Sequence, residues 1–355
     1  MASEFELETV SAMEPLRSEW TELAARNRSI FKTWEWLSTW WDHFGLRRQL
    51  MVTVVRSNGR LVGILPMYRW QTRPLCVLRF LGHSVGDELG PICAPADRPL
   101  VARALRRVLE ASRWDLLLAE QIPADEHWST VLGGRVLSLE GNPVLRFGAG
   151  GWEGFLRERS ANVREQVRRR PRKLAREHFV RYRPVEGRED LKAELDILFR
   201  LHRARWAATP SGLLAHERFH RSIAGLAAQR NWLRLWILEI EGQAAAAVYG
   251  FRFAGVESYY QAGRDPRWDC YHIGFVLLAH AIRQAAQDSM AEYRLLRGDE
   301  RYKYRFATAD PGLETLGVPH GRVTRIGLPV LDSLRTAKGP VGRISRRATG
   351  RFLHR

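Results

Sequence analysis

The fold of this chain is decided by a stretch that reads Met51-Val-Thr-Val-Val55, then Asn58-Gly59, then Leu61-Val-Gly-Ile-Leu65. Two aliphatic, β-branched runs flank an Asn-Gly pair, and Asn-Gly supplies the two positive φ angles of a type I′ turn. The stretch therefore predicts a β-hairpin. The same pattern returns later as Leu235–Ile240, Glu241-Gly242 and Ala244–Phe253, and Val256–Ala262 adds a third predicted strand.

Helices are predicted on both sides of each hairpin. Before the hairpins the apolar spacing predicts a strand at Phe5–Val10 and helices at Ser18–Arg26, Thr33–Phe44, Leu191–Trp206 and Glu217–Arg230. After the first hairpin it predicts a strand at Leu75–Leu81, a helix at Arg98–Ser112 and a strand at Asp115–Ala119. After the second it predicts a helix at Tyr271–Ser289 and a strand at Glu292–Leu296. Gly59 and Gly242 lie 183 residues apart, which indicates an internal duplication. Each unit is predicted to be an α+β sandwich.

The length of 355 residues favours two domains, since a single hydrophobic core stops growing near 300 residues or below. A Gly-rich break at 148–151 places the expected domains at 1–150 and 151–325, followed by a basic tail at 326–355. Thirteen Trp and 45% hydrophobic residues are enough for sizeable cores. Trp34, Trp36, Trp40 and Trp41 are expected to pack in one of them, with a sugar-stacking platform as the alternative.

Positive charge is concentrated in two segments. The net charge is +17, and Arg157–Arg183 carries eleven Arg/Lys against three Glu while Arg322–Arg355 carries nine against one Asp. Such patches indicate an anionic partner: coenzyme phosphates, a phosphate-linked sugar, an anionic membrane or RNA. Nucleic acid is disfavoured because no aromatics are interleaved with the arginines. Pro171 is expected to break or kink the helix of the first segment.

Cys76, Cys93 and Cys270 show no metal-ligand or disulfide spacing, so no metal is expected. The chain start lacks the basic and apolar regions of a signal peptide, and the longest apolar stretch, Ala244–Phe251, is too short to cross a bilayer. We therefore expect a cytoplasmic protein, with basic segments available to hold it peripherally at the inner membrane.

Six stretches together resemble the CelD/BcsL family of GNAT acetyltransferases, which belong to cellulose and exopolysaccharide synthesis. They are Trp40-Trp-Asp-His-Phe-Gly45, Gly59-Arg-Leu-Val-Gly-Ile-Leu-Pro66, Leu78-Arg-Phe-Leu-Gly82 with Asp87, Leu201-His-Arg-Ala-Arg-Trp206, Tyr260-Gln-Ala-Gly263 with Asp265, and Leu296-Arg-Gly-Asp-Glu-Arg-Tyr-Lys303. The architecture is also similar to that of the FemAB peptidyltransferases, which use aminoacyl-tRNA.

The resemblance implies tandem GNAT-like domains, with mixed, mostly antiparallel sheets flanked by helices. It implies an acyltransferase that moves an acetyl group from acetyl-CoA to a hydroxyl or amine of a polysaccharide or envelope precursor. Two alternatives stay open: a FemAB-like transferase that uses aminoacyl-tRNA, and a catalytically degenerate accessory protein of a polysaccharide synthase.

A GNAT donor loop has the pattern Arg/Gln-x-x-Gly-x-Gly/Ala at the start of a helix, where backbone N–H groups hold phosphates. In the second half, Tyr271-His-Ile-Gly274-Phe-Val276 occupies this place, so Tyr271 and Gly274 are the cofactor-binding candidates. In the first half, Arg79-Phe-Leu-Gly82-His-Ser84 is nearer to the pattern, but no periodic helix follows it directly.

Acyl transfer needs a base for the acceptor proton and donors for the carbonyl oxygen. Asp299 or Glu300 is the predicted base, and Tyr302 or Lys303 the predicted donor, in a segment that begins at Arg297 and turns at Gly298. The alternative is a solvated loop that holds one ion pair.

The remaining candidates come from three other places in the sequence. His202 and Trp206 are four residues apart on one helix face, with Arg205 between them, and can grip a sugar or exchange a proton. Tyr260 and Gln261 end an apolar strand and can bind an acceptor hydroxyl, unless Tyr260 is simply core. Asp87 is expected either to line a cleft between the units or to cap a turn.

Overall fold

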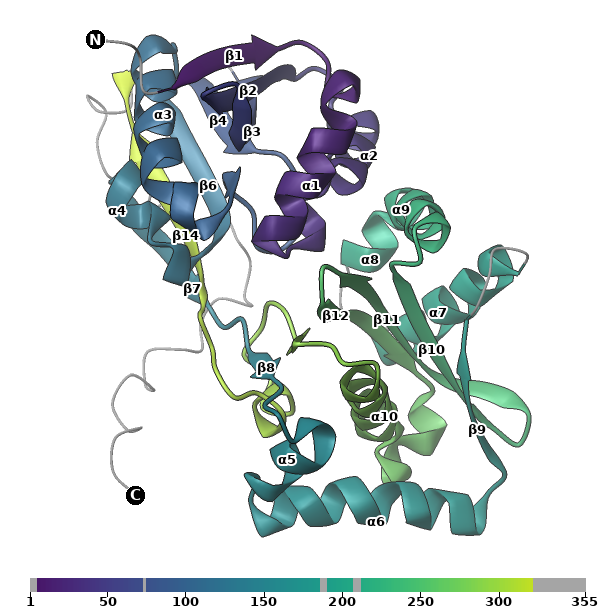
Figure 1. Ribbon diagram of the computed structural model, residues 1–355. Helices are drawn as coiled ribbons and strands as arrows, with labels where there is room; N and C mark the ends of the chain where they lie inside the picture. Colours follow the sequence, from purple (N-terminus) through teal and green to yellow (C-terminus); the bar gives the residue numbers. More distant parts are fainter. Residues whose placement is uncertain (1–4, 73–74, 186–189, 207–211, 322–355) are drawn as a thin grey trace.

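Two α+β units make up the computed structural model, which describes residues 5–72, 75–185, 190–206 and 212–321 (Figure 1). The predicted hairpins are confirmed: β2 (Gln49–Ser57) pairs with β3 (Arg60–Thr72), and β10 (Leu233–Ile240) pairs with β11 (Gln243–Phe253). The turn residues have the positive φ angles that a type I′ turn needs, 51° and 73° at Asn58 and Gly59 and 50° and 74° at Glu241 and Gly242.

The first sheet has eight strands in the order β1-β2-β3-β4-β6-β14-β7, with β5 paired to β3. All pairings are antiparallel except that of β4 with β6. The remaining bounds are β1 (Glu6–Val10), β4 (Leu75–Phe80), β5 (Ile92–Cys93), β6 (Leu116–Pro123), β7 (Arg135–Glu140) and β14 (Leu313–Pro319). Its two faces are covered by α1 (Arg17–Asn27) with α2 (Trp34–Phe44), and by α3 (Arg98–Ala111) with α4 (Trp128–Leu132).

The second sheet has six strands in the order β8-β13-β12-β11-β10-β9. Its other strands are β8 (Val144–Arg146), β9 (Val180–Pro184), β12 (Val256–Arg264) and β13 (Glu292–Arg294). Helices α7 (Leu191–Arg205), α8 (Gly212–Ala215) and α9 (Glu217–Gln229) cover one face, and α5 (Gly151–Arg157), α6 (Ala161–Glu177) and α10 (Ile273–Gln287) cover the other. Both units therefore have mixed, mostly antiparallel sheets between helices, as predicted.

The sheets divide the chain differently from the expected boundary at residue 150. Strand β8, at residues 144–146, already belongs to the second sheet, where it pairs with β13. Strand β14, at residues 313–319, returns to the first sheet and lies between β6 and β7. Figure 1 shows the chain crossing from the second unit back to the first and entering β14 there. The basic tail expected at 326–355 lies outside the described residues.

One hydrophobic core joins the two units, and Trp36 of α2 lies at its centre. The Trp36 ring makes edge contacts with Phe219 of α9 and Phe251 of β11, each at 5.4 Å between centroids. Trp36 and Trp40 are fully buried, which confirms the predicted core role, while Trp34 and Trp41 pack against the same core from its border. The units are thus fixed to one another by apolar packing and not only by the chain crossings.

Helix α6 continues through Pro171, so the predicted break is wrong. Ser160 caps the helix start by accepting a hydrogen bond from the amide of Val163 at 3.4 Å. Val167 and Leu174, on either side of the proline, are buried in the second core. Their packing holds both turns in place and offsets the one backbone hydrogen bond that the proline removes.

Within the described residues, no helix combines the length and apolarity needed to cross a bilayer.

Candidate active site

Two strands of the second sheet run parallel and then separate. Strand β12 pairs with β13 from Val256 to Ser258, whose partners are Glu292 to Arg294. From Tyr259 to Arg264, β12 pairs only with β11 among the described strands, and the register between these two slips at Tyr249 and Gly250. Among the described strands, one edge of β12 therefore has no partner where β13 ends, and such an edge can pair with an extended bound molecule.

Three polar side chains meet at this open edge. Tyr302 donates a hydrogen bond to the hydroxyl of Tyr259 at 3.3 Å. Arg205, in the last turn of α7, lies beside both tyrosine hydroxyls, and its guanidinium also lies over the ring of Trp206 at 4.9 Å. Burial raises the pKa of Tyr302 above its usual range, so its hydroxyl stays protonated. The structure thus brings together three predicted residues, Arg205, Trp206 and Tyr302, around one that sequence reasoning missed, Tyr259.

His202 fixes helix α7 to strand β12 near Ala262. Its Nδ1 lies 2.9 Å from the carbonyl oxygen of Ala262, and burial lowers its pKa. Helix α7 crosses β12 so closely here that a side chain at Gly263 would collide with the backbone of His202. His202 and Trp206 share a helix face as predicted, with ring centroids 6.3 Å apart. The imidazole is only 1% exposed, so it positions α7 on β12 and does not face solvent.

The start of α10 lies at the far end of the open edge. Gly274 is in the first turn of this helix, and the first N–H groups of a helix have no acceptor within it. The hydroxyl of Tyr271 donates to Glu177 at 2.9 Å and lies 3.0 Å from Nε2 of His178. The Tyr271 side chain is therefore bound to the end of α6, while the side chain of Arg264 lies next to Gly274.

Two arginines face this helix start. The guanidinium of Arg170, from α6, lies 4.7 Å from the ring centre of Phe275, and that of Arg305 lies 5.7 Å from the same ring. Partial burial and the positive charge of Arg305 lower the pKa of Arg170. Arg305 donates to Gln166 at 2.8 Å, and neither arginine has a carboxylate partner among the described residues. Two cations that repel one another at a helix N-terminus favour a bound anion.

Among the described residues of the first unit, the start of the corresponding helix is less suited to an anion. Its corresponding helix, α3, begins with Arg98 and Pro99, and proline has no N–H to donate. The carboxylate of Asp97 stands before this helix and pairs with Arg60 at 3.3 Å. The loop that follows Gly82 does not lead into a helix; it extends to the second unit and carries Asp87 there.

Asp87 reaches the interface between the units. Its Oδ1 lies 3.7 Å from Nε of Arg297, and its Oδ2 accepts a hydrogen bond from the Arg297 amide at 3.4 Å. Burial raises the pKa of Asp87, although the guanidinium of Arg297 opposes this shift. Next to this pair, the hydroxyl of Tyr260 donates to the carbonyl oxygen of Val85 at 2.5 Å. Asp87 was expected either to lie between the two units or to cap a turn. Its contacts with Arg297 support the position between the units.

Three of the candidates, Asp299, Glu300 and Lys303, are held in a loop by contacts within the protein. Lys303 is 3% exposed, and its ammonium donates to the carbonyl oxygens of Leu296 and Arg297 at 3.2 and 2.6 Å and pairs with Glu300 at 3.0 Å. Asp299 accepts from the Gly141 amide at 3.0 Å. All three donor hydrogens of Lys303 are used, so this side chain fastens the loop and has none left for an oxyanion.

Tyr260 and Gln261, the predicted acceptor-binding pair, are separated by the geometry of β12. The ring of Tyr260 packs against Trp36 and Phe251 at centroid distances of 5.7 and 5.8 Å, and burial raises its pKa. Gln261 lies opposite Tyr249 of β11 and is half-buried. Tyr260 thus belongs to the shared core, with its hydroxyl at the border of the interface.

Sequence reasoning missed two residues, Tyr259 and Arg305. Tyr259 precedes Tyr260 on a strand, so alternation places their side chains on opposite faces, and that signal was available. Arg305 follows the conspicuous charged run and has no pattern of its own. Groups of His, Cys, Asp and Glu that could hold a metal ion are absent from the described residues.

Residues 161–304 match a known family, the acetyltransferase (GNAT) domain. The matched range includes the open edge of β12 and the start of α10. The chain therefore carries a GNAT acetyltransferase domain, and the protein is an enzyme of the GNAT acyltransferase type.

Several solved structures share the two-unit fold. The crystal structure of FemX has a TM-score of 0.61 at 8% identity and covers 93% of this chain and 100% of that chain. The structure of L-PGS from Bacillus licheniformis has a TM-score of 0.55 at 12% identity and covers 92% and 97%. The C-terminal domain of a putative lysylphosphatidylglycerol synthetase from Agrobacterium fabrum has a TM-score of 0.53 at 12% identity and covers 91% and 96%. At these identities the likeness concerns the fold. No curated protein matches the sequence.

Proposed function

We propose that this protein transfers an acetyl group from acetyl-CoA to a hydroxyl or amine of a polysaccharide or envelope precursor. The choice of acetyl-CoA as the donor rests on one observation. Two arginines, Arg170 and Arg305, lie at the start of α10 beside the open edge of β12. In a CoA thioester, a pyrophosphate links the phosphorylated adenosine to an extended chain that contains two amides and ends in the thioester. The helix start suits the pyrophosphate, and the open edge suits the amides.

The reacting thioester is then expected near Tyr259, where β12 and β13 separate. An acceptor oxygen or nitrogen attacks the carbonyl carbon, the C–S bond breaks, and the sulfur leaves as a thiolate. Tyr302 stays protonated and lies beside Arg205. Its O–H donates to Tyr259 in the unliganded protein and can rotate to donate a hydrogen bond to the oxyanion or a proton to the thiolate. This role replaces the donor role predicted for Lys303.

The base that takes the acceptor proton is proposed to be Asp87. It comes from the first unit, and its carboxylate lies beside Arg297 just after the end of β13. A raised pKa brings a carboxylate closer to the range in which it can accept a proton effectively. Asp299 and Glu300 are less suited, because one is bound to the backbone of Gly141 and the other to Lys303.

The acceptor class rests on the resemblance to the CelD/BcsL family. The junction of the units supports a polar acceptor, because Asp87, Arg297 and the hydroxyl of Tyr260 all gather there. A cytoplasmic reaction is part of the proposal, since acetyl-CoA is its donor.

The proposal is tested by thermal shift and by release of free thiol. Acetyl-CoA should raise the melting temperature of the full chain, and CoA should be released when hydroxyl- or amine-bearing envelope precursors are added. The variant with Arg170→Ala and Arg305→Ala should lose the thermal shift. Absence of both stabilisation and thiol release in the unmodified protein would refute the donor assignment.

A second candidate is transfer of an aminoacyl group from aminoacyl-tRNA. The similarity in fold to FemX over nearly the whole chain favours it. The two candidates separate in one experiment, because aminoacyl-tRNA would then support transfer of a labelled amino acid in the absence of any CoA thioester. In that case Arg170 and Arg305 would contact the terminal phosphates of the tRNA in place of the pyrophosphate.

A further inference from the structure

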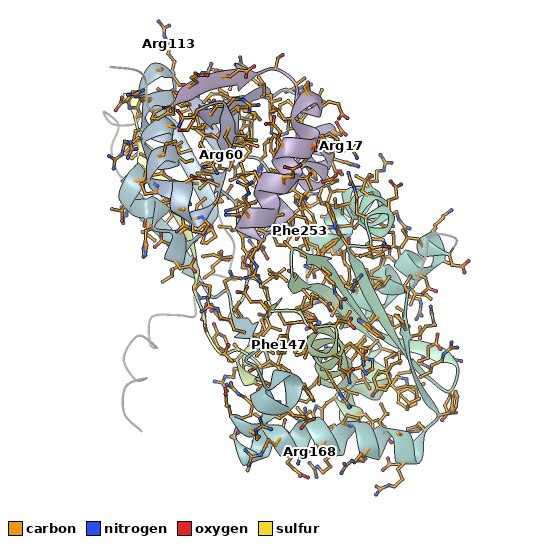
Figure 2. All side chains as sticks on the ribbon, viewed as in Figure 1. Arg17, Arg60, Arg113, Phe147, Arg168 and Phe253 are labelled. Atoms are coloured by element: carbon orange, nitrogen blue, oxygen red, sulfur yellow. The ribbon has the colours of Figure 1, made fainter. Side chains whose placement is uncertain are left out.

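The outer side of α6 carries a row of cations that ends in an exposed phenylalanine. Arg168, Arg172 and Arg176 are exposed and follow one another at four-residue spacing, which places them in one row along the helix. Arg169 is exposed beside this row, and Phe179, just past the helix end, is 70% exposed. These five residues are called the basic face below. Figure 2 shows Arg168 pointing away from the body of the molecule.

This charge is not neutralised within the described parts of the protein. Glu165 lies 3.7 Å from Arg169, and Glu177 lies 3.2 Å from Arg176. Both pairs are solvent-exposed and therefore contribute little. Arg168 and Arg172 have no carboxylate partner among the described residues. The face therefore keeps a net positive potential that an external anionic surface can meet.

The inner side of the same helix fixes the orientation of the row. Val167 and Leu174 are buried in the second core, and Arg170 lies over Phe275. The helix therefore cannot rotate to hide its arginines, and they form a preorganised, straight line on the outside of the unit. Figure 1 shows α6 as an outer helix that runs past α5 and α10.

We propose that the basic face docks on a lipid bilayer with anionic headgroups. Arginines in a row on one helix side can lie along a plane of lipid phosphates, and each contributes to attraction by an anionic leaflet. Phe179 supplies an apolar side chain that can enter the interfacial region beside them. Single-stranded nucleic acid is a poorer partner, because its binding surfaces stack several bases on aromatic rings and this face has one phenylalanine at its end.

Docking in this way leaves the candidate active site accessible. Arg170 and the start of α10 lie on the opposite side of α6 from the basic face. The inference does not depend on the proposed function, since attachment to a bilayer needs neither donor nor acceptor.

Vesicle co-sedimentation of the full chain tests the proposal. Vesicles of phosphatidylcholine with phosphatidylglycerol, in a ratio of about two to one, should bind the protein, and vesicles of phosphatidylcholine should not. Replacing Arg168, Arg172 and Arg176 with Gln should lower the partition coefficient about 100-fold, which is about fivefold for each charge. Phe179→Ser should lower it about tenfold without any change of charge.

The matched control replaces Arg47, Arg113 and Arg218 with Gln. All three are exposed and lie outside α6, and their replacement removes the same charge as the test variant. Vesicle binding should therefore change less than about threefold. Equal losses in the two triple variants would overturn the proposal, because a general charge effect would then explain them. Failure of the unmodified chain to bind the anionic vesicles, or binding of bulk tRNA that depends on the same three arginines without vesicle binding, would also overturn it. Unchanged melting temperatures confirm that each variant is folded.

Discussion

Asp87 and Arg297 lie more than two hundred residues apart in sequence, and their contact joins the two units. The carboxylate Oδ1 of Asp87 lies 3.7 Å from Nε of Arg297, and Oδ2 accepts from its amide at 3.4 Å. The loop that carries Asp87 has positive φ angles of 73° at Ser84 and 54° at Glu88, which non-glycine residues seldom adopt. A strained loop held against the other unit fixes the position of this carboxylate, as the proposed role of Asp87 requires.

Replacing Asp87 with Asn should lower kcat/KM about 100-fold or more, because a positioned base contributes about that much. Burial raises the pKa of this carboxyl group, and the group accepts a proton only when ionised. The activity of the unmodified enzyme should therefore fall as the pH decreases through a pKa above the usual 3.8, and this acidic limb should vanish in the variant. A pH profile of thiol release measures both effects. Asp299→Asn is the control, and a larger loss in it than in Asp87→Asn would contradict the assignment.

Replacing Arg170 and Arg305 with Ala should weaken binding of CoA about 100-fold. Each arginine can make a charge-assisted hydrogen bond to phosphate, and the loss of each is worth about tenfold. The value of kcat at saturating donor should change little, because the two groups bind a part of the donor that does not react. Isothermal titration with CoA measures the affinity. Arg169→Ala is the control, since this residue is exposed on the other side of the same helix, and a comparable loss there would argue for a general effect of charge.

Tyr302→Phe should lower kcat about 10- to 100-fold and leave the KM for the donor nearly unchanged. The hydroxyl that is lost donates to Tyr259 and contacts Arg205 at the point where the strands separate. Tyr304→Phe is a matched control, because that hydroxyl binds Asp299 and Asp310 in the structural loop. Steady-state kinetics of both variants decide the matter, and a rise of KM with unchanged kcat in Tyr302→Phe would show that the hydroxyl only binds substrate.

Local pattern was enough to predict the two hairpins and the helices around them, because turn chemistry at Gly59 and Gly242 and apolar spacing act over short distances. The edge strands β7 and β8 and the interior strand β14 could not be predicted in this way. Each is short or half-buried, and its place depends on partners far along the chain, as when β14 enters between β6 and β7. The helix does not break at Pro171, because tertiary packing outweighs a local rule.

The sequence was enough to name several residues of the candidate site, but not to say what each of them does there. Lys303 and Asp299 were singled out as charged groups after a buried strand. The sequence does not reveal that Lys303 donates to backbone carbonyl oxygens and that Asp299 accepts from a backbone amide. Arg205 and Tyr302 lie about a hundred residues apart, and only the crossing of α7 over β12 brings them together. Their proximity depends on how helices and strands are arranged in the fold, which local sequence patterns do not show.

Lys303→Met should lower the free energy of unfolding by about 2–4 kcal/mol. The ammonium satisfies the carbonyl oxygens of Leu296 and Arg297 in a buried position, and the thioether cannot replace these hydrogen bonds. Urea unfolding followed by fluorescence measures the change. Lys192→Met, at an exposed position of α7, should change the same quantity by less than about 0.5 kcal/mol. A Lys303→Met protein of full stability and no activity would restore a catalytic role to this lysine.

His220 should make the protein sensitive to acid. Burial in the shared core lowers its pKa from 6.5 to about 3, so the folded protein keeps this imidazole neutral. In the unfolded chain the group takes up a proton near pH 6.5, and the unfolded state therefore binds more protons than the folded state between these two values. Stability from this group is complete above pH 6.5 and decreases as the pH falls toward 3, by at most about 1.4 kcal/mol per pH unit. His220→Gln keeps a polar side chain of similar size and does not titrate, so its melting temperature should decrease less steeply between pH 6.5 and pH 4. Differential scanning calorimetry at matched pH values measures both slopes, and equal slopes would show that another group controls the acid sensitivity.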